Sequence, residues 1–257
     1  MHPHMYRTLL GSCLIGLATL SPLSHATEAT VVVEQVNIDY RPITALKRMG
    51  AALRELKAFE ITTQATHEKV LTNGQKIQIG GSTLIEYVAP NQFNASVETA
   101  NKAVDFYFDG KQATLYSPKK GYYSTVDYTG SVREMLDTVE SKYGLAVPLK
   151  DLFIWGTPEA DNVQFDSAIY VGRDFVGEVL CDHYAFRQGS VDWQIWIEST
   201  ERLLPRKVAI TNTADAAMPQ HVEILDWNTA PKFAATHFTF KAPANATAIK
   251  FSERAAQ

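Results

Sequence analysis

The stretch VDFYFDGKQATLYSPKKGYYSTV, residues 104–126, predicts three consecutive strands joined by tight turns. An apolar and aromatic run precedes Asp109-Gly110, and residues of alternating polarity follow it. Asp-Gly is a preferred pair for a two-residue hairpin turn, because glycine readily adopts positive φ and aspartate tolerates it. A second turn at 118–121 leads into the third strand. The stretch therefore predicts an antiparallel meander that is apolar on one face.

The same strand signal continues on both sides of this meander. Asn73-Gly74 predicts a second hairpin turn. Gly80-Gly81 lies in the middle of the strand that follows this turn and predicts a bulge or a sharp bend there. Period-two alternation and turn residues predict the remaining strands at 59–66, 75–87, 93–97, 162–171, 179–187, 192–198, 205–213, 220–227 and 237–241.

Two helices are expected among these strands. Asp39 can cap the first, in which Pro42 is tolerated because its missing N–H falls in the first turn. Ser131 and Glu134 form a capping-box pattern at the start of the second helix. Each helix has a single apolar stripe, which for the first comprises Leu46, Met49, Leu53 and Leu56. Strand-rich halves around a helical insert favour an α+β, mainly β fold, with one strongly curved antiparallel sheet and a few helices packed on it.

Residues 1–26 are expected to be a secretory signal peptide. Arg7 supplies a positive charge, residues 8–20 form an apolar core, and Ser24 and Ala26 provide small residues at a cleavage site. The apolar run is shorter than the ~20 residues that a spanning helix needs. We therefore expect export to the periplasm with cleavage after Ala26, and no stable membrane anchor afterwards. Cys13 lies inside the apolar core rather than after it, which argues against lipidation.

Residues 27–257 are predicted to form a single domain. Cys181 is the one cysteine that remains after cleavage, so the domain has no internal disulfide and its core must supply its stability. The formal net charge of the full chain is −4, and no cluster of lysine or arginine occurs. This balance argues against nucleic acid or an anionic membrane surface as the main partner.

The most tempting chemical cluster is Cys181-Asp182-His183. In a strand, Cys181 and His183 point to one face and Asp182 to the other, and no second cysteine or HxxxH pattern adds metal ligands. No serine lies in a G-x-S-x-G elbow, and the carboxylates fall at turns or alternate positions without converging. We therefore expect no enzyme, no metal site and no cofactor. A hydrolase or metal enzyme built on Cys181 and His183 ranks below the interpretations that follow.

Two groups of segments carry a family resemblance. The first is ALKRMGAALRELKAFEITT (45–63), NGQKIQ (73–78) and the hairpins of 104–126; the second is PLKDLFIWG (148–156), CDHYAFRQGSVDWQIWIE (181–198) and LPRKVAITNT (204–213). Together they resemble a family of predicted periplasmic bacterial proteins of unknown function, related to the LolA and LolB lipoprotein carriers. The resemblance covers about residues 38–241. It implies a half-open β-barrel with helices on its concave side, plugging a hydrophobic concavity that holds acyl chains.

The apolar strand faces predict either an ordinary core or the wall of a ligand cavity, and the pattern alone leaves both open. The leading hypothesis is a periplasmic binding or carrier protein that shelters a lipid or acyl chain. The alternative is an envelope protein–protein interaction or sensor module on the same scaffold, with a protein partner and no lipid ligand. For the leading hypothesis, the expected cavity wall consists of Ile85, Phe106, Phe108, Leu115, Trp193 and Ile195.

Overall fold

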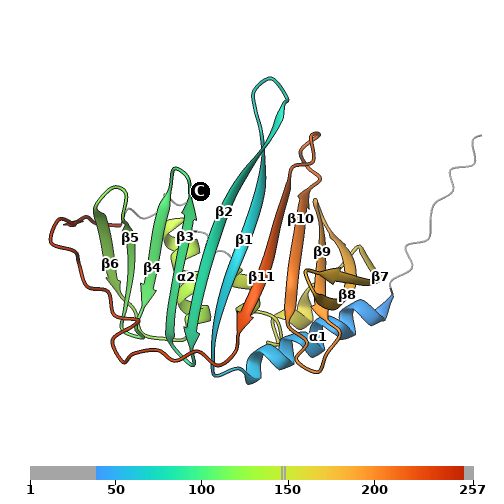
Figure 1. Cartoon of the computed structure of the whole chain (residues 1–257), viewed down its shortest axis with the longest axis horizontal. Helices are drawn as coiled ribbons and strands as arrows, with labels where there is room; N and C mark the ends of the chain where they lie inside the picture. The colour runs from blue at the N-terminus through green and yellow to red at the C-terminus, as the bar shows by residue number, and fades with distance from the viewer. Residues whose placement is uncertain (1–38, 146, 148, 252–257) are drawn as a thin grey trace, which may run out of the picture. The chain divides into compact units, whose positions relative to one another are not determined.

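The computed structural model describes residues 39–145, 147 and 149–251. The expected signal peptide and residues 27–38 of the expected domain lie outside these residues. The described chain forms one sheet of twelve strands with two α-helices and two short 3₁₀ helices (Figure 1). The strands are β1 Ala58–Val70, β2 Lys76–Val88, β3 Gln92–Thr99, β4 Ala103–Phe108, β5 Gln112–Ser117, β6 Tyr122–Asp127, β7 Ser167–Val176, β8 Val179–Gln188, β9 Val191–Glu198, β10 Pro205–Asn212, β11 Gln220–Asn228 and β12 Thr247–Ala248.

The sheet is curved and does not close into a barrel. Its strand order is β12-β6-β5-β4-β3-β2-β1-β11-β10-β9-β8-β7, so β12 and β7 lie at opposite edges (Figure 1). Neighbouring strands pair in antiparallel fashion, and only the two-residue pairing of β12 with β6 is parallel. The central β1–β2 pairing joins an N-terminal meander to a C-terminal one through β11. The predicted fold class, a strongly curved and unclosed antiparallel sheet, is confirmed.

The helices begin where the capping residues predict. Asp39 precedes α1 (Tyr40–Glu55) and accepts a hydrogen bond from the Arg41 backbone N–H at 2.9 Å. Ser131 and Glu134 form a complete capping box before α2 (Val132–Tyr143). The 3₁₀ helices are η1 (Lys150–Phe153) and η2 (Ala160–Asn162). Among the described residues, none of the helices has the combined length and hydropathy that crossing a bilayer requires.

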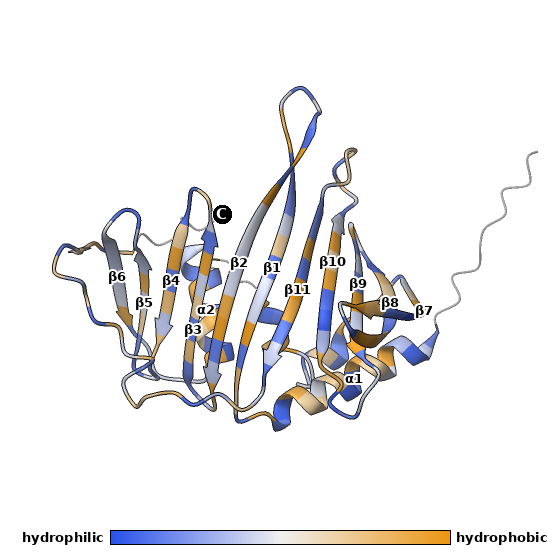
Figure 2. Ribbon diagram, viewed as in Figure 1, coloured by the Kyte–Doolittle hydropathy of each residue, from blue (hydrophilic) through white to orange (hydrophobic). Residues whose placement is uncertain are grey.

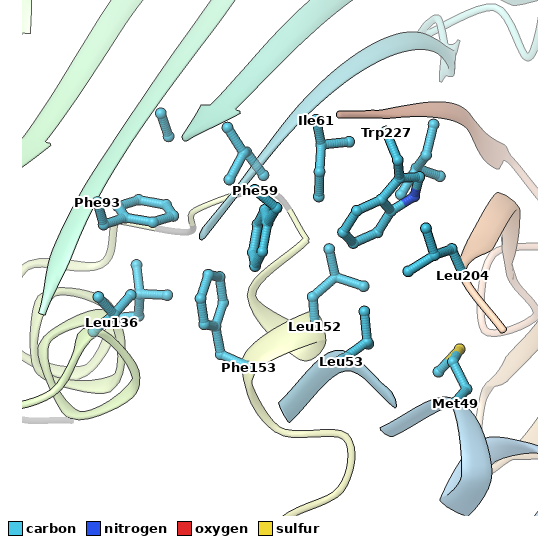
Figure 3. Packing of buried hydrophobic residues seen from close by; sticks show 14 of the residues in the cluster. Met49, Leu53, Phe59, Ile61, Phe93, Leu136, Leu152, Phe153, Leu204 and Trp227 are labelled. Atoms are coloured by element: carbon cyan, nitrogen blue, oxygen red, sulfur yellow. The ribbon is translucent and has the colours of Figure 1, made fainter. Parts of the chain in front are cut away.

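The core lies between one face of the sheet and the helices, and we call this face the inner face. Figure 3 shows Phe59, Phe93 and Ile61 from the strands above residues of α1, α2 and η1. Hydrophobic and hydrophilic bands alternate along β3, as expected for a strand with two different faces (Figure 2). The core side chains that are exposed by 2% or less include Met49, Leu46, Phe59, Ile61, Ile85, Phe93, Phe108, Met135 and Leu136.

The turn at Asp109-Gly110 differs by one residue from its prediction. Phe108 pairs with Ala113, and the backbone N–H of Asp109 donates to the Gln112 carbonyl, so Gly110 and Lys111 form the two-residue loop. Gly110 has a φ of +90°. Asp109 stays at the strand end because its carboxylate accepts hydrogen bonds from the backbone N–H groups of Lys111 and Gln112, at 3.0 and 2.9 Å.

Two further predictions are corrected. Gly80 and Gly81 pair with Thr66 and Ala65 in unbroken register, so the bulge, one of the two irregularities that this glycine pair predicts, is absent. The strand predicted at 237–241 is also wrong. Residues 237 and 238 lie in a turn and no strand forms there, and the segment runs from β11 past strands β1–β5 to reach β6 (Figure 1). Asn94 of β3 donates to the His237 carbonyl at 3.3 Å, and the Phe240 ring contacts Tyr107, Tyr116 and Tyr123, so side chains rather than a ladder hold the segment.

Candidate functional site

The inner face changes in character toward the tip of the β1–β2 hairpin. Cross-strand pairing places Ile61 beside Ile85, deep in the core. Four residues closer to the tip along each strand, and beyond the Thr63–Thr83 pair, the row holds Ala65 beside Gly81. These small residues fill little of the space that Ile61 and Ile85 fill below them. Across six strands, the paired residues of this row are Thr99, Gly81, Ala65, Glu223, Val208 and Ile195.

A cavity of about 880 Å³ lies at this row. That volume is within the range of small-molecule sites, which are mostly apolar and concave. The sheet supplies one wall, and residues between 147 and 163 supply the other. Leu152 and Ile195, both at most 5% exposed, lie at its buried end, whereas Ile79 and Ile210 are 40% and 38% exposed. The segment opposite the sheet contributes Val147, Leu149, Asp151, Leu152, Ile154, Trp155, Glu159 and Val163.

The second wall is fixed to α1. Arg54 of α1 donates to the carbonyl of Phe153 at 2.9 Å and to that of Leu152, which are the last residues of η1. Burial lowers the pKa of the Arg54 guanidinium. Just beyond η1, the backbone of Gly156 packs directly on that of Gly50 in α1, a contact that leaves no room for a side chain on either residue. The helix therefore positions the cavity wall through the Arg54 side chain and through the backbone contact at Gly50.

Aromatic rings close one end of the cavity. The Trp155 and Trp193 rings lie 5.8 Å apart between centroids and so join the two walls. Trp193 also stacks on Phe186, at 4.2 Å and an interplanar angle of 17°. Stacked and offset rings of this kind are worth about 0.5–1.5 kcal/mol beyond the area that they bury. Trp193 is thus held in place from both sides.

A carboxylate is buried in this apolar setting. Glu223 lines the cavity with a side chain that is only 4% exposed. Its Oε1 accepts a hydrogen bond from the Thr63 hydroxyl at 2.7 Å, and its Oε2 lies 3.4 Å from His221 Nε2. His67 and His221 pair two residues beyond Ala65 and Glu223 on the same face, and both also line the cavity. Their ring centroids are 6.1 Å apart. Within the described residues, no group of three or more His, Cys, Asp or Glu side chains is arranged to hold a metal ion.

Asp151 lies on the opposite wall. The surface of Asp151 faces the cavity rather than other side chains. The protein atoms around the cavity nevertheless reduce the hydration of its carboxyl group. This burial is the main reason that the pKa of the Asp151 carboxyl is raised, while the neighbouring Lys150 opposes the shift. Lys150 itself pairs with Glu140 of α2 and with Asp137 at 3.3 Å. Its charge is therefore shared with carboxylates that do not line the cavity.

The structure places all six of the expected wall residues on the inner face, at two different levels. Trp193 and Ile195 line the cavity. Ile85, Phe106 and Phe108 are at most 3% exposed in the packed core, and Leu115 packs against that core. These four residues belong to or pack against the core between the sheet and the helices, and none of them lines the cavity. Ligand contact by Trp193 and Ile195 stays a prediction.

The cysteine and histidine considered for chemistry lie away from the cavity. Cys181 belongs to a small buried cluster with Val176, Trp196 and Ala209. Burial raises the pKa of its thiol to about 11, which disfavours the reactive thiolate. His183 stacks on Trp196 at 3.9 Å and bonds to Gln194 at 2.9 Å. These contacts give both residues packing roles.

The sequence pattern does not single out the residues at the centre of the cavity wall on the sheet, which are Ala65, Gly81 and Glu223. Alanine in a strand is unremarkable, and glutamate alternates with apolar residues along β11 as it does in many half-exposed strands. The Gly80-Gly81 pair was the one local signal at this site, and it predicted a backbone irregularity instead. Only cross-strand register brings the three residues into one row.

A family model described as "Predicted periplasmic protein (DUF2092)" matches residues 43–252. No curated protein matches the chain.

Several solved structures are similar in fold at low sequence identity. The lipoprotein LppX of Mycobacterium tuberculosis has a TM-score of 0.47 and 11% identity, over 76% of this chain and 98% of that one. LprF of Mycobacterium bovis has a TM-score of 0.44 and 13% identity, over 82% and 99%. A LolA superfamily protein of Nitrosomonas europaea has a TM-score of 0.34 and 8% identity, over 77% and 97%. TM-scores below 0.5 are too low for these likenesses to say what this chain binds.

Proposed function

The chain belongs to the DUF2092 family of predicted periplasmic proteins, and we propose that it binds a lipid or another apolar ligand in the cavity of its curved sheet. The single observation that carries the proposal is the cavity of about 880 Å³. Tight packing normally leaves few voids larger than a water molecule in a protein interior. A hollow of this size, lined mainly by aliphatic and aromatic side chains, supports a binding role.

The free energy available in such a site is substantial. Each CH₂ group that leaves water contributes about 0.8 kcal/mol. A chain that buried eight CH₂ groups would gain about 6 kcal/mol before the costs of ordering it, which is enough for useful binding. The exposed Ile79 and Ile210 at the rim would contact the part of the ligand that enters last. Reversible uptake from one surface and release to another is what a carrier requires.

The proposal predicts saturable binding of an uncharged apolar probe. We expect the protein purified from the periplasm without detergent to enhance the fluorescence of N-phenyl-1-naphthylamine, with a stoichiometry of one probe per chain. Energy transfer from Trp155 or Trp193, which line the cavity, should rise in parallel. A linear, non-saturating signal equal to that of an unrelated protein would contradict the proposal.

A protein-binding role is the second candidate, and one observation favours it. Edge strand β7 has no strand partner on its outer side among the described residues, and it exposes Ile169, Val171 and Phe175 by 51%, 54% and 65%. An open apolar edge can pair with another chain. This candidate predicts no saturable probe binding and crosslinking of an envelope protein to β7, so the same titration separates the two functions.

A further inference from the structure

Among the described residues that line the cavity, the charged side chains are carboxylates. Glu223 lies on the sheet wall and Asp151 on the opposite segment; Glu159 also lines the cavity but forms an ion pair with Arg133. No lysine or arginine is present among the described lining residues, whose basic members are His67 and His221. Two basic side chains at that segment, Arg54 from α1 and Lys150 from η1, are engaged with other groups. Arg54 donates to the carbonyls of Leu152 and Phe153, and Lys150 pairs with Asp137 and Glu140.

Glu223 retains unused capacity to accept hydrogen bonds. An ionised carboxylate offers about four lone-pair sites. One short bond from Thr63, at 2.7 Å, and one long contact with His221, at 3.4 Å, are the partners found for it. A buried carboxylate is costly unless it is paired and fully hydrogen-bonded. Because Glu223 lines the cavity, a ligand can supply the missing donors.

From these observations we infer that the cavity selects amphiphiles whose polar end is a protonated amine and discriminates against those that end in a carboxylate or a phosphate. The inference rests on the proposed function and specifies its ligand class. The amine would donate to Glu223 while the apolar chain lies against Ile195, Trp193 and Leu152. An anionic end would instead meet carboxylates on both walls, in surroundings where charges are weakly screened. The apolar lining provides the affinity for the alkyl chain, and the carboxylates provide the preference for an amine over an anionic end.

The test compares three ligands with the same alkyl chain. Dodecylamine, dodecanol and dodecanoate are used to displace N-phenyl-1-naphthylamine at about pH 7, where the amine is protonated and the acid ionised, and below micelle-forming concentrations. We expect dodecylamine to bind at least about tenfold more tightly than dodecanoate, with dodecanol between them. In Glu223→Gln, the ratio of amine to carboxylate affinity should fall about fivefold or more, and dodecanol should bind as before.

Two further variants complete the design. Glu60→Gln is the matched control, because it also removes one carboxylate charge from the sheet. Glu60 lies between the inner-face residues Phe59 and Ile61, so its side chain points to the opposite face. This variant should leave the ratio of amine to carboxylate affinity unchanged. Asp151→Asn lowers the carboxylate charge from the opposite wall and leaves the Thr63–Glu223 bond intact, so it keeps the test decisive if Glu223→Gln folds poorly.

Equal binding of amine and carboxylate, or an unchanged ratio in both cavity variants, would overturn the inference alone. Failure of all three ligands to displace the probe would overturn the inference together with the proposed function.

Discussion

Replacing Gly156 by alanine is expected to lower the free energy of unfolding by about 3 kcal/mol. Gly156 has a φ of +80°, a conformation that costs a residue with a side chain about 1–2 kcal/mol. A Cβ atom there would also overlap the backbone of Gly50 and lie 3.0 Å from the Ala51 nitrogen. These are backbone atoms of α1, which cannot move aside as a flexible side chain can. Overpacking of this kind costs about 1–3 kcal/mol.

Gly177→Ala is the matched control for this prediction. Gly177 has a φ of +59°, and a Cβ atom there would meet nothing within 4 Å. The control therefore carries the conformational cost without the overlap, and we expect it to lower the free energy of unfolding by only about 1 kcal/mol. Urea unfolding followed by circular dichroism measures both variants. Equal destabilisation of the two would show that the contact between α1 and the segment after η1 is not as close as the structure has it.

The second large effect is expected from filling the cavity. Ala65 lies between Gly81 and Glu223 in the row that lines the cavity, and an indole at this position would occupy the space that the small side chain leaves. If Ala65→Trp displaces the equivalent of three CH₂ groups of ligand, binding weakens by about 2.4 kcal/mol, or roughly 60-fold in Kd. We expect this loss for N-phenyl-1-naphthylamine and for dodecanol, measured by fluorescence titration. The free energy of unfolding should change little, because the hollow accepts the ring.

Gln64→Trp provides the control for this variant. Gln64 is exposed and precedes Ala65, so in a strand it points to the opposite face of the sheet. The same residue type added one position away should leave the Kd of both ligands within about twofold of the wild-type value. Undiminished binding in Ala65→Trp would place the ligand somewhere other than the cavity.

The sequence predicts local structure well in this protein, because local interactions determine it. Asp39 and Ser131 cap helices through hydrogen bonds to residues two and three positions away. The turn glycines Gly74 and Gly110 adopt the positive φ that their hairpins require. Period-two alternation also assigns Phe106, Phe108 and Ile195 correctly to one face of the sheet. Each of these features depends on residues that are close together in the chain.

The cavity depends on contacts that alternation does not report. Alternation identifies the face that a side chain occupies, but it does not say how far along each strand the helices extend. Phe106 is packed in the core, whereas Trp193, on the same face of the sheet, lines the hollow. The decisive row joins Gly81, Ala65 and Glu223 from three strands, with Glu223 more than 130 residues from the others in the chain. Register between distant strands, rather than any motif, makes the site.

Native mass spectrometry of the protein purified from the periplasm without detergent tests the central claim most directly. The account predicts a discrete mass above that of the chain, which disappears on organic extraction and matches one apolar molecule per protein in the extract. It also predicts that Ala65→Trp shows the mass of the chain alone, while Gln64→Trp retains the adduct. If the wild-type protein shows only the mass of the chain, and still does so after incubation with a lipid extract of the cell envelope, the cavity is not a ligand site.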